Sequence, residues 1–229
     1  MNYPRETEIG KVLTEGGIHG GRICIRPLTH ETADATAELY TRVFLNDEPM
    51  TRRHGIDPDE FLPFACEYLR FCADRGLSVI ATDRMTDEVI AFVLSSDLTT
   101  DWNAAGPRIG RLLSFFQESM EIIEELESQC MDLHDVAPGT VLHIFQVGAR
   151  RRYRGKGLVT CMVRHTLAMA KEKGFTMVVA DCTGPASTRV CERCGFVRAA
   201  YIAYDEFFVN GRAFFSGIPG GITLMVRNL

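Results

Sequence analysis

The feature that most constrains this chain is a basic, glycine-containing loop between a strand and a helix. Residues 140–147 are rich in β-forming side chains and predict a strand, residues 149–157 form the loop, and helical spacing begins at Leu158. Residues 175–182 follow as an almost continuous apolar run, which is typical of a buried strand in a parallel pair. The pattern therefore predicts two neighbouring strands joined by a helix, with the loop at its N-terminus.

This loop has the properties of a phosphate-binding site. Backbone N–H groups at a helix N-terminus point outward and hold phosphate together with the helix dipole. Gly155 and Gly157 allow a ligand to approach the backbone closely, and Arg152, Arg154 and Lys156 add positive charge. The alternative interpretation is a basic surface turn in which glycines begin the helix.

Two common phosphate loops do not match the spacing. A P-loop requires Ser or Thr after its Lys, whereas Gly157 follows Lys156. A dinucleotide-binding loop requires a third glycine, and none follows Gly157 within the next three residues. The loop therefore belongs to neither class.

The rest of the chain predicts one domain, residues 1–229, without repeats or a clear linker. Residues 1–20 read as a loose lead-in, and residues 97–139 as an insert with a helix whose glutamates Glu118 to Glu127 face solvent. Further strands are expected at 22–28, 77–82, 88–95, 196–204 and 221–227, and further helices from Thr29 or Thr32 to Asp47, at 58–75, over 109–126 and at 186–194.

Composition limits the compartment and the partners. The formal charge of −5 argues against nucleic acid or an anionic membrane as a partner, and no apolar run is long enough to span a membrane. Most of the eight cysteines lie in apolar runs and no signal sequence opens the chain, so we expect reduced thiols and a cytoplasmic protein. Cys191 and Cys194 form a CxxC motif without a second Cys/His pair, so we expect no metal site.

At this point the residues resemble a known family. Residues 152–157 match the Q/R-x-x-G-x-G/A loop of the GCN5-related N-acetyltransferase (GNAT) superfamily, and residues 186–196 resemble its last helix with a Gly-Phe turn. The resemblance covers about residues 22–204. Residues 44–50, with their Asp-Glu-Pro segment, and residues 183–190 are similar to insect-type arylalkylamine N-acetyltransferases, as is the tail from Tyr204 to Phe215.

The resemblance implies an α/β (α+β) fold. Its central sheet is mixed and mostly antiparallel, with one splayed parallel pair and helices on both faces. It also implies an acetyl-CoA-dependent enzyme that acetylates the primary amine of a small molecule, most like an arylalkylamine, as a monomer or homodimer. Two alternatives stay open. One is another acceptor, such as a polyamine, an aminoglycoside, an amino acid or a protein N-terminus; the other is a non-catalytic CoA-binding module.

The chemistry requires a base, because an alkylamine with a pKa of about 10 is almost fully protonated at neutral pH. The resemblance assigns this role to Glu48, whose alternative interpretation is a solvated carboxylate at a helix end. His143 is the competing base, since its spacing before Gly155 resembles a strand histidine of vertebrate serotonin N-acetyltransferases and its ordinary pKa suits the role. It is equally compatible with a hydrogen-bonded core histidine.

Two hydroxyl side chains match positions that the insect-type family uses near the thioester. Thr183 and Ser187 would act there on the thiolate or the cofactor, and the alternative is that either one caps a helix. The Tyr that often serves as general acid in the superfamily is absent near Cys191, which leaves the acid open. The resemblance implies cofactor contacts from Phe145, Gln146, Val147, Arg152, Arg154, Gly155, Lys156, Gly157, Leu158 and Ser187.

Overall fold

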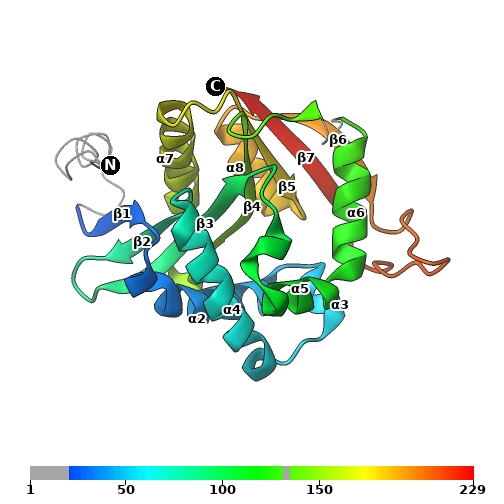
Figure 1. Cartoon of the computed structure of the whole chain (residues 1–229), viewed down its shortest axis with the longest axis horizontal. Coiled ribbons are helices and arrows are strands. Elements are labelled where there is room, and N and C mark those ends of the chain that lie inside the picture. The colour runs from blue at the N-terminus through cyan, green and yellow to red at the C-terminus, as the bar shows by residue number, and fades with distance from the viewer. Residues whose placement is uncertain (1–20, 131–134) are drawn as a thin grey trace.

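Within the described residues, seven strands form one mixed sheet that runs through the protein (Figure 1). The structure is a computed structural model that describes residues 21–130 and 135–229. The expected lead-in at residues 1–20 lies outside them, as do residues 131–134 of the expected insert. The strand order across the sheet is β1-β2-β3-β4-β5-β7-β6. The strands are β1 (Ile23–Pro27), β2 (Val79–Asp83), β3 (Glu88–Asp97), β4 (Val141–Ala149), β5 (Met177–Cys182), β6 (Val197–Ala203) and β7 (Gly221–Asn228).

Helices cover both faces of this sheet. They are α2 (His30–Asp47), α3 (Thr51–His54), α4 (Pro58–Arg75), α5 (Pro107–Ser114), α6 (Gln117–Ser128), α7 (Leu158–Glu172) and α8 (Pro185–Arg193), with 3₁₀ turns at Trp102–Ala105 and Arg151–Tyr153. On one face α2 and α4 pack over β3 and α6 packs over β6 and β7; on the other, α7 packs over β2 to β4 and α8 over β5 and β7 (Figure 1). None of the described helices is both long and apolar enough to cross a membrane.

The expected parallel pair is present at the centre of the sheet. Strands β4 and β5 run parallel, and all other neighbouring strands run antiparallel. The parallel pairing ends where Ile144 lies opposite Ala180. Beyond that point, among the described residues, β4 pairs only with β3, and this pairing continues to Ala149. The sheet is therefore open between β4 and β5 from Phe145 onward, which confirms the splayed arrangement.

β4 contains one extra residue where the two strands separate. Leu94 of β3 lies opposite Gln146 and Ser95 lies opposite Ile144, so Phe145 has no counterpart in β3. Such a bulge reverses the face to which each later residue points. Before the bulge the even-numbered residues of β4 lie in the core beneath α7, and after it the odd-numbered residues do.

Capping residues set the boundaries of the first long helices. Thr29 is the N-cap of α2, and its backbone N–H donates to the hydroxyl of Thr32 at 3.1 Å. Asp57 is the N-cap of α4 and accepts the N–H of Asp59 at 2.8 Å. Gly76 ends α4 with a φ of +62°. These expected starts and ends are confirmed.

The helix expected over residues 109–126 is in fact two helices. α5 ends at Ser114 and α6 begins at Gln117, and between them Phe116 has non-helical dihedral angles. Phe116 is 7% exposed, and its ring packs against Phe61 with centroids 6.0 Å apart. Burial of this ring in the core beneath α2 and α4 outweighs continuation of the helix, because a buried aromatic side chain removes a large apolar area from water.

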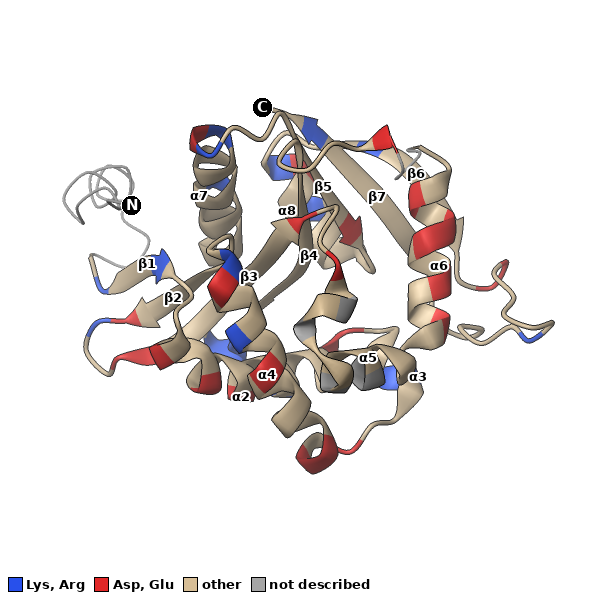
Figure 2. Ribbon diagram, viewed as in Figure 1, with Lys and Arg blue, Asp and Glu red and all other residues tan. Residues whose placement is uncertain are grey.

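The glutamates of α6 do not all face solvent. Figure 2 shows acidic residues along this helix, and Glu124 and Glu125 are exposed, but Glu127 is only 5% exposed. The expectation of a uniformly solvated acidic face is therefore wrong at Glu127. Its position is explained by neighbours on β4 and β5, which the sequence pattern of one helix does not contain.

Candidate active site

The opening between β4 and β5 exposes an edge of β4 at the middle of the sheet. Backbone groups along such an edge can bind an extended ligand in the way that a sheet binds an added strand. Phe145, Gln146 and Val147, which the sequence analysis named as cofactor contacts, lie on this segment. The Gln146 side chain points to the α4 side, where its Oε1 accepts a hydrogen bond from the Tyr68 hydroxyl at 3.3 Å.

The loop after β4 leads directly into the N-terminus of α7. Gly155 has a φ of +72°, and Gly157, the N-cap of α7, has a φ of +78°. Both lie in the left-handed region that favours glycine. Lys156, between them, is exposed. The positive end of the helix dipole and the first N–H groups of α7 therefore lie beside a flexible cation, as an anion-binding site requires.

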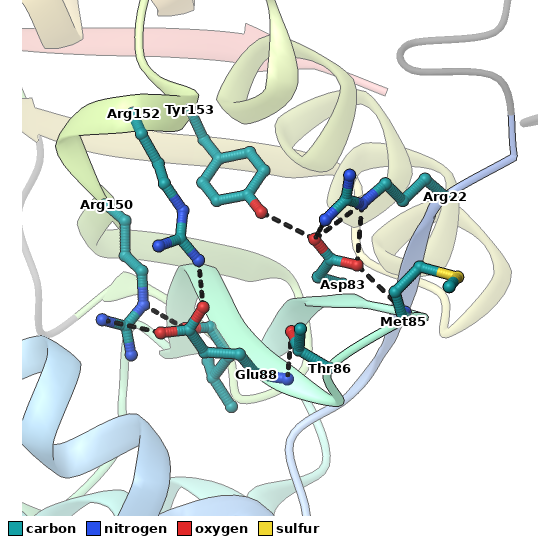
Figure 3. Close-up of polar contacts among 9 residues, drawn as sticks. Arg22, Asp83, Met85, Thr86, Glu88, Arg150, Arg152 and Tyr153 are labelled. Carbon is teal, nitrogen blue, oxygen red and sulfur yellow. Dashed lines mark hydrogen bonds and ion pairs between the residues drawn. The ribbon is translucent and has the colours of Figure 1, made fainter.

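One carboxylate on β3 holds two arginines of this loop (Figure 3). Arg150 Nη1 lies 3.1 Å from Glu88 Oε1, and its Nε donates to the Val89 carbonyl at 2.8 Å. Arg152 pairs with the second oxygen of Glu88. Glu88 therefore fixes the start of the loop against the N-terminal end of β3.

A second carboxylate, at the end of α2, holds the other two arginines. Asp47 Oδ2 lies 2.6 Å from Arg154 Nη2, and Asp47 Oδ1 lies 3.0 Å from Arg151 Nη2. Although burial acts in the opposite direction, hydrogen bonds from Arg154 and Arg151 lower the pKa of Asp47. These groups border a cavity of about 430 Å³ between α2 and the loop. Its lining residues are Leu39, Arg42, Val43, Asn46, Asp47, Arg150, Arg151, Arg152 and Arg154.

Asp83, at the end of β2, anchors the loop from its other side (Figure 3). Its carboxylate accepts hydrogen bonds from Arg22 Nε at 2.8 Å, from the Met85 N–H at 3.0 Å and from the Tyr153 hydroxyl at 2.8 Å. These donors, the Arg22 side chain first, hold the pKa of Asp83 well below its usual range. The loop is thus positioned by three carboxylates from three different elements.

Glu48 lies at the end of α2, and its carboxylate caps the short helix α3. Oε1 accepts the N–H of Met50 at 3.0 Å and Oε2 accepts the N–H of Thr51 at 2.5 Å. The side chain is half-buried. It lies close to Tyr204, whose pKa is raised by burial and then by the negative charge of Glu48. The contacts of Glu48 are therefore those of a helix cap beside a buried phenol.

Thr183 and Ser187 lie at the end of β5, beside the opening. Gly184 is the N-cap of α8, and the Ser187 hydroxyl donates to the Gly184 carbonyl at 2.9 Å. The interpretation of either residue as a helix N-cap is therefore wrong. The backbone carbonyl of Thr183 accepts a hydrogen bond from the Tyr204 hydroxyl at 2.8 Å.

Cys191 lies in the core beneath α7 and is 5% exposed. Its Sγ lies 3.6 Å from Cys182 Sγ, and this contact, with burial, raises the pKa of its thiol far above the usual range. A thiol in this environment is a packing residue and not a reactive one. All eight cysteines are free thiols.

His143 lies between two buried carboxylates on the face covered by α6. Its Nε2 is 2.7 Å from Asp181 Oδ2, and its Nδ1 is 4.0 Å from Glu127 Oε1. Burial lowers its pKa, but the charge and hydrogen bond of Asp181 and the charge of Glu127 give a net increase. The sequence analysis missed both carboxylates. Asp181 is the one acidic residue in the apolar run 175–182, and that signal could have identified it.

Aromatic side chains lie on the same side of the sheet. The ring of Phe145 is 5.3 Å from that of Trp102 between centroids and 5.8 Å from that of His143. His54 of α3 lies between Phe116 and Phe214, at centroid distances of 5.2 and 5.1 Å. Phe145, with Trp102 and His143 against its ring, therefore gives this face of the opening an aromatic border.

The structure brings the expected site residues to one opening in the sheet but divides the two candidate bases. Glu48 and Thr183 lie near Tyr204, while His143 belongs to a network with Asp181 and Glu127. Among the described contacts none joins Glu48 to His143. The expected loop residues, from Arg152 to Leu158, continue the strand that borders the opening.

The structure is similar to solved acetyltransferases. It superimposes on arylalkylamine N-acetyltransferase 2 from Aedes aegypti with a TM-score of 0.75 and 20% identity, covering 90% of this chain and 98% of that one. For the polyamine N-acetyltransferase of Drosophila melanogaster, described as forming N-acetylagmatine, the TM-score is 0.67 and the identity 18%, covering 90% of this chain and 100% of that one. For yncA of Salmonella typhimurium, a putative acetyltransferase solved with acetyl-CoA, the TM-score is 0.55 and the identity 16%, covering 91% of this chain and 94% of that one.

These superpositions establish the fold, and a match to a family model shows which family the chain belongs to. The model of the acetyltransferase (GNAT) family matches residues 37–196. That stretch is more than half of the chain and includes the basic loop, the opening between β4 and β5, and α8. The chain therefore belongs to the acetyltransferase (GNAT) family.

Proposed function

We propose that this protein is an acetyl-CoA-dependent N-acetyltransferase whose acceptor is the primary amine of a small arylalkylamine. The observation that carries the proposal is one of continuity: the strand that borders the opening runs directly into the basic loop at the N-terminus of α7. One extended ligand, with phosphates at one end and a thioester at the other, would follow that path. The aromatic border of the opening supports the choice of acceptor. We further propose a single domain and, from the free thiols, a cytoplasmic location.

Acetyl-CoA supplies an activated acetyl group as a thioester when it is bound. The residues proposed to hold its phosphates are Arg152, Arg154, Gly155, Lys156, Gly157 and Leu158, and those proposed to hold its pantetheine arm are Phe145, Gln146, Val147 and Ser187. A cavity of about 430 Å³ beside the loop supports the phosphate assignment, since it lies within the usual size range of ligand sites. The positive φ angles at Gly155 and Gly157 support it too, because they leave backbone N–H groups accessible to an anion.

The transfer itself requires a proton acceptor, a polarised carbonyl and a proton donor. The amine nitrogen would form a bond to the thioester carbon, the carbon–sulfur bond would break, and the thiolate would gain a proton. We assign the amine proton to the Glu48 carboxylate, polarisation of the carbonyl to the Val147 N–H, and delivery of a proton to sulfur to the hydroxyl of Thr183 or Ser187. His143 is the alternative base.

Thiol release from acetyl-CoA tests the function. Purified protein would be assayed with tyramine, dopamine, tryptamine, serotonin and polyamines, and turnover is expected to be highest with the arylalkylamines. Turnover with polyamines alone would contradict the proposed arylalkylamine acceptor and would indicate a polyamine acceptor instead. Binding of CoA without turnover of any amine would indicate a non-catalytic CoA-binding module.

Glu48→Gln tests the assignment of the base. Loss of a general base lowers kcat by about 10² to 10⁴, and the deficit shrinks at high pH, where more amine is unprotonated. The matched control is Glu38→Gln, an exposed carboxylate on the same helix, which is expected to leave kcat unchanged. An unaltered pH–rate profile in Glu48→Gln would exclude Glu48 as the base.

A further inference from the structure

Three buried side chains from three elements meet on the face of the sheet covered by α6. They are Glu127 of α6, His143 of β4 and Asp181 of β5, and one potential ligand atom from each lies within 4.8 Å of the others. The side chains are 7%, 15% and 4% exposed, respectively. Apolar side chains surround them, among them Leu126 of α6 and Val179 of β5. Charges in such surroundings interact strongly because little water screens them.

One buried oxygen of this cluster has no hydrogen-bond donor among the described residues. Asp181 Oδ2 accepts from His143, but its Oδ1 is buried and finds no donor among the described residues. A buried carboxylate oxygen without a donor is destabilising, and native proteins fill such positions in most cases. A ligand that binds here would therefore donate a hydrogen bond to Asp181 Oδ1.

The composition of the cluster also favours a positively charged ligand. The cluster contains two carboxyl groups and one imidazole, so its acidic groups outnumber its basic group. The groups that act on Glu127 come from β4 (His143), β5 (Asp181) and its own helix (Glu124). Burial first, and then the negative charges of Asp181 and Glu124, outweigh His143 and raise the pKa of Glu127 to about 7. A ligand that binds there must bring positive charge as well as a hydrogen-bond donor.

The position of the cluster identifies where that ligand comes from. Ala180 forms the last parallel pair with Ile144, and Asp181 is the next residue along β5. Asp181 therefore lies at the point where β4 and β5 separate, two residues before Thr183. The ring of Phe145 adjoins that of His143 on the same face. A molecule that enters the opening from the α6 side meets the cluster beside an aromatic surface.

We infer that Glu127, His143 and Asp181 form the subsite in which the primary ammonium group of the acceptor first binds, before its proton passes to the base. The inference rests on the proposed function and adds residues that the family motifs do not contain. An ammonium group meets both requirements, since it carries one positive charge and three N–H donors. A metal ion fits less well. Nε2 of the single imidazole already bonds to Asp181, which leaves Nδ1 and Glu127 as the ligands on its other side.

This subsite selects against acceptors that carry a carboxylate on the amine-bearing carbon. In such a molecule the carboxylate would lie one carbon from the ammonium and beside Glu127 and Asp181. Like charges at that distance repel strongly where water is excluded. The subsite therefore accepts an arylalkylamine and rejects the corresponding aromatic amino acid. The reaction that supplies its substrate is accordingly a decarboxylation, which removes that carboxylate and leaves the amine.

Binding of tyramine and tyrosine to the protein saturated with CoA tests the inference without any turnover. Isothermal titration calorimetry at pH 8 is expected to show tyramine binding and no tyrosine binding. Glu127→Gln and Asp181→Asn are expected to raise the Kd of tyramine at least ten-fold. The matched control, Glu125→Gln, changes an exposed carboxylate on the same helix and is expected to leave that Kd unchanged.

The pH dependence separates charge recognition from a structural effect. Lowering the pH from 8 to 6 protonates Glu127, whose pKa is about 7, and so removes one negative charge from the cluster; the wild-type Kd for tyramine is therefore expected to rise. Glu127→Gln is expected to lose this dependence, and circular dichroism would confirm that it is folded. A tyramine Kd unaffected by Glu127→Gln, or tyrosine binding as tight as tyramine binding, would overturn the inference. Absence of thiol release with every amine would instead overturn the proposed function, which the binding data do not address.

Discussion

The phenol of Tyr204 donates a 2.8 Å hydrogen bond to the backbone carbonyl of Thr183, and so joins the segment after β6 to the end of β5. Tyr204 is completely buried and packs against Phe215 with ring centroids 5.7 Å apart. It also lies near the Glu48 carboxylate. The residue thus connects the proposed base, the end of β5 and the core formed by α6 and β7.

Tyr204→Phe removes that hydrogen bond while it keeps the ring. The Thr183 carbonyl loses its donor, and we expect a loss of about 1 kcal/mol in the free energy of unfolding. Urea denaturation measures this loss. Tyr201→Phe is the control, because Tyr201 is 54% exposed and its substitution is expected to change stability little. Equal stability of the two variants would show that the hydrogen bond adds nothing to the fold.

Gly148→Ala is expected to destabilise the protein by overpacking. A Cβ at Gly148 would lie 2.4 Å from Cζ of Phe92 and 2.9 Å from Cγ1 of Val43. Forced insertion of an atom into a packed core costs roughly 1–3 kcal/mol, which a shift in the thermal midpoint reports. Gly110→Ala on α5, where a Cβ meets nothing within 4 Å, is expected to stabilise by about 0.5–1 kcal/mol. Equal shifts in the thermal midpoint for Gly148→Ala and Gly110→Ala would show that the close contacts of Gly148 with Phe92 and Val43 do not limit the side chain at this position.

Lys156→Gln tests the proposed phosphate-binding loop without breaking an ion pair among the described residues. We expect KM for acetyl-CoA to rise several-fold with kcat nearly constant, and the difference from wild type to shrink at high salt, because exposed charges are screened. Lys173→Gln, at the opposite end of α7, is the matched control and is expected to leave KM unchanged. If both variants raised KM alike, the effect would reflect overall charge and not a site.

Asp83→Asn is expected to lower stability at neutral pH more than in acid. The folded-state pKa of Asp83 lies below its unfolded value of about 3.9, so its ionised form stabilises the protein above that pH. This contribution is lost as the pH falls toward the folded-state pKa. The gap in urea midpoint between wild type and Asp83→Asn should therefore narrow from pH 7 to pH 3.5. Asp87→Asn is the control, since the Asp87 side chain is 82% exposed; a constant gap for Asp83→Asn would contradict the prediction.

Local signals in the sequence predicted most of the framework. Caps such as Thr29, Asp57 and Gly76 act within one turn of a helix, and the apolar run at 175–182 marks a strand buried on both faces. These features depend on near neighbours in the chain. The parallel pair and the loop at the N-terminus of α7 could therefore be predicted together.

Features that depend on distant partners could not be predicted. The break between α5 and α6 arises because Phe116 packs against the core of α2 and α4, which lies far away in the sequence. Glu127 has the periodicity of a solvated residue, but β4 and β5 bring His143 and Asp181 to it. The bulge at Phe145 has no signature in the alternation of residues 140–147, because the mismatch arises from pairing with β3.

Because of the bulge at Phe145, the direction in which the side chains of β4 point depends on the exact number of residues in the strand. Deletion of the extra residue would restore regular alternation and leave Gln146 and Gly148 on the α2 side, whereas deletion of one residue between the bulge and the loop would exchange the faces of every residue after it. If β4 binds the cofactor as proposed, insertions and deletions that alter the acceptor are compatible with this binding only in connecting segments such as 98–106 and 204–220. Divergence of acceptor preference among proteins of this fold is accordingly expected to appear as variable lengths in those segments around a β4 of fixed length.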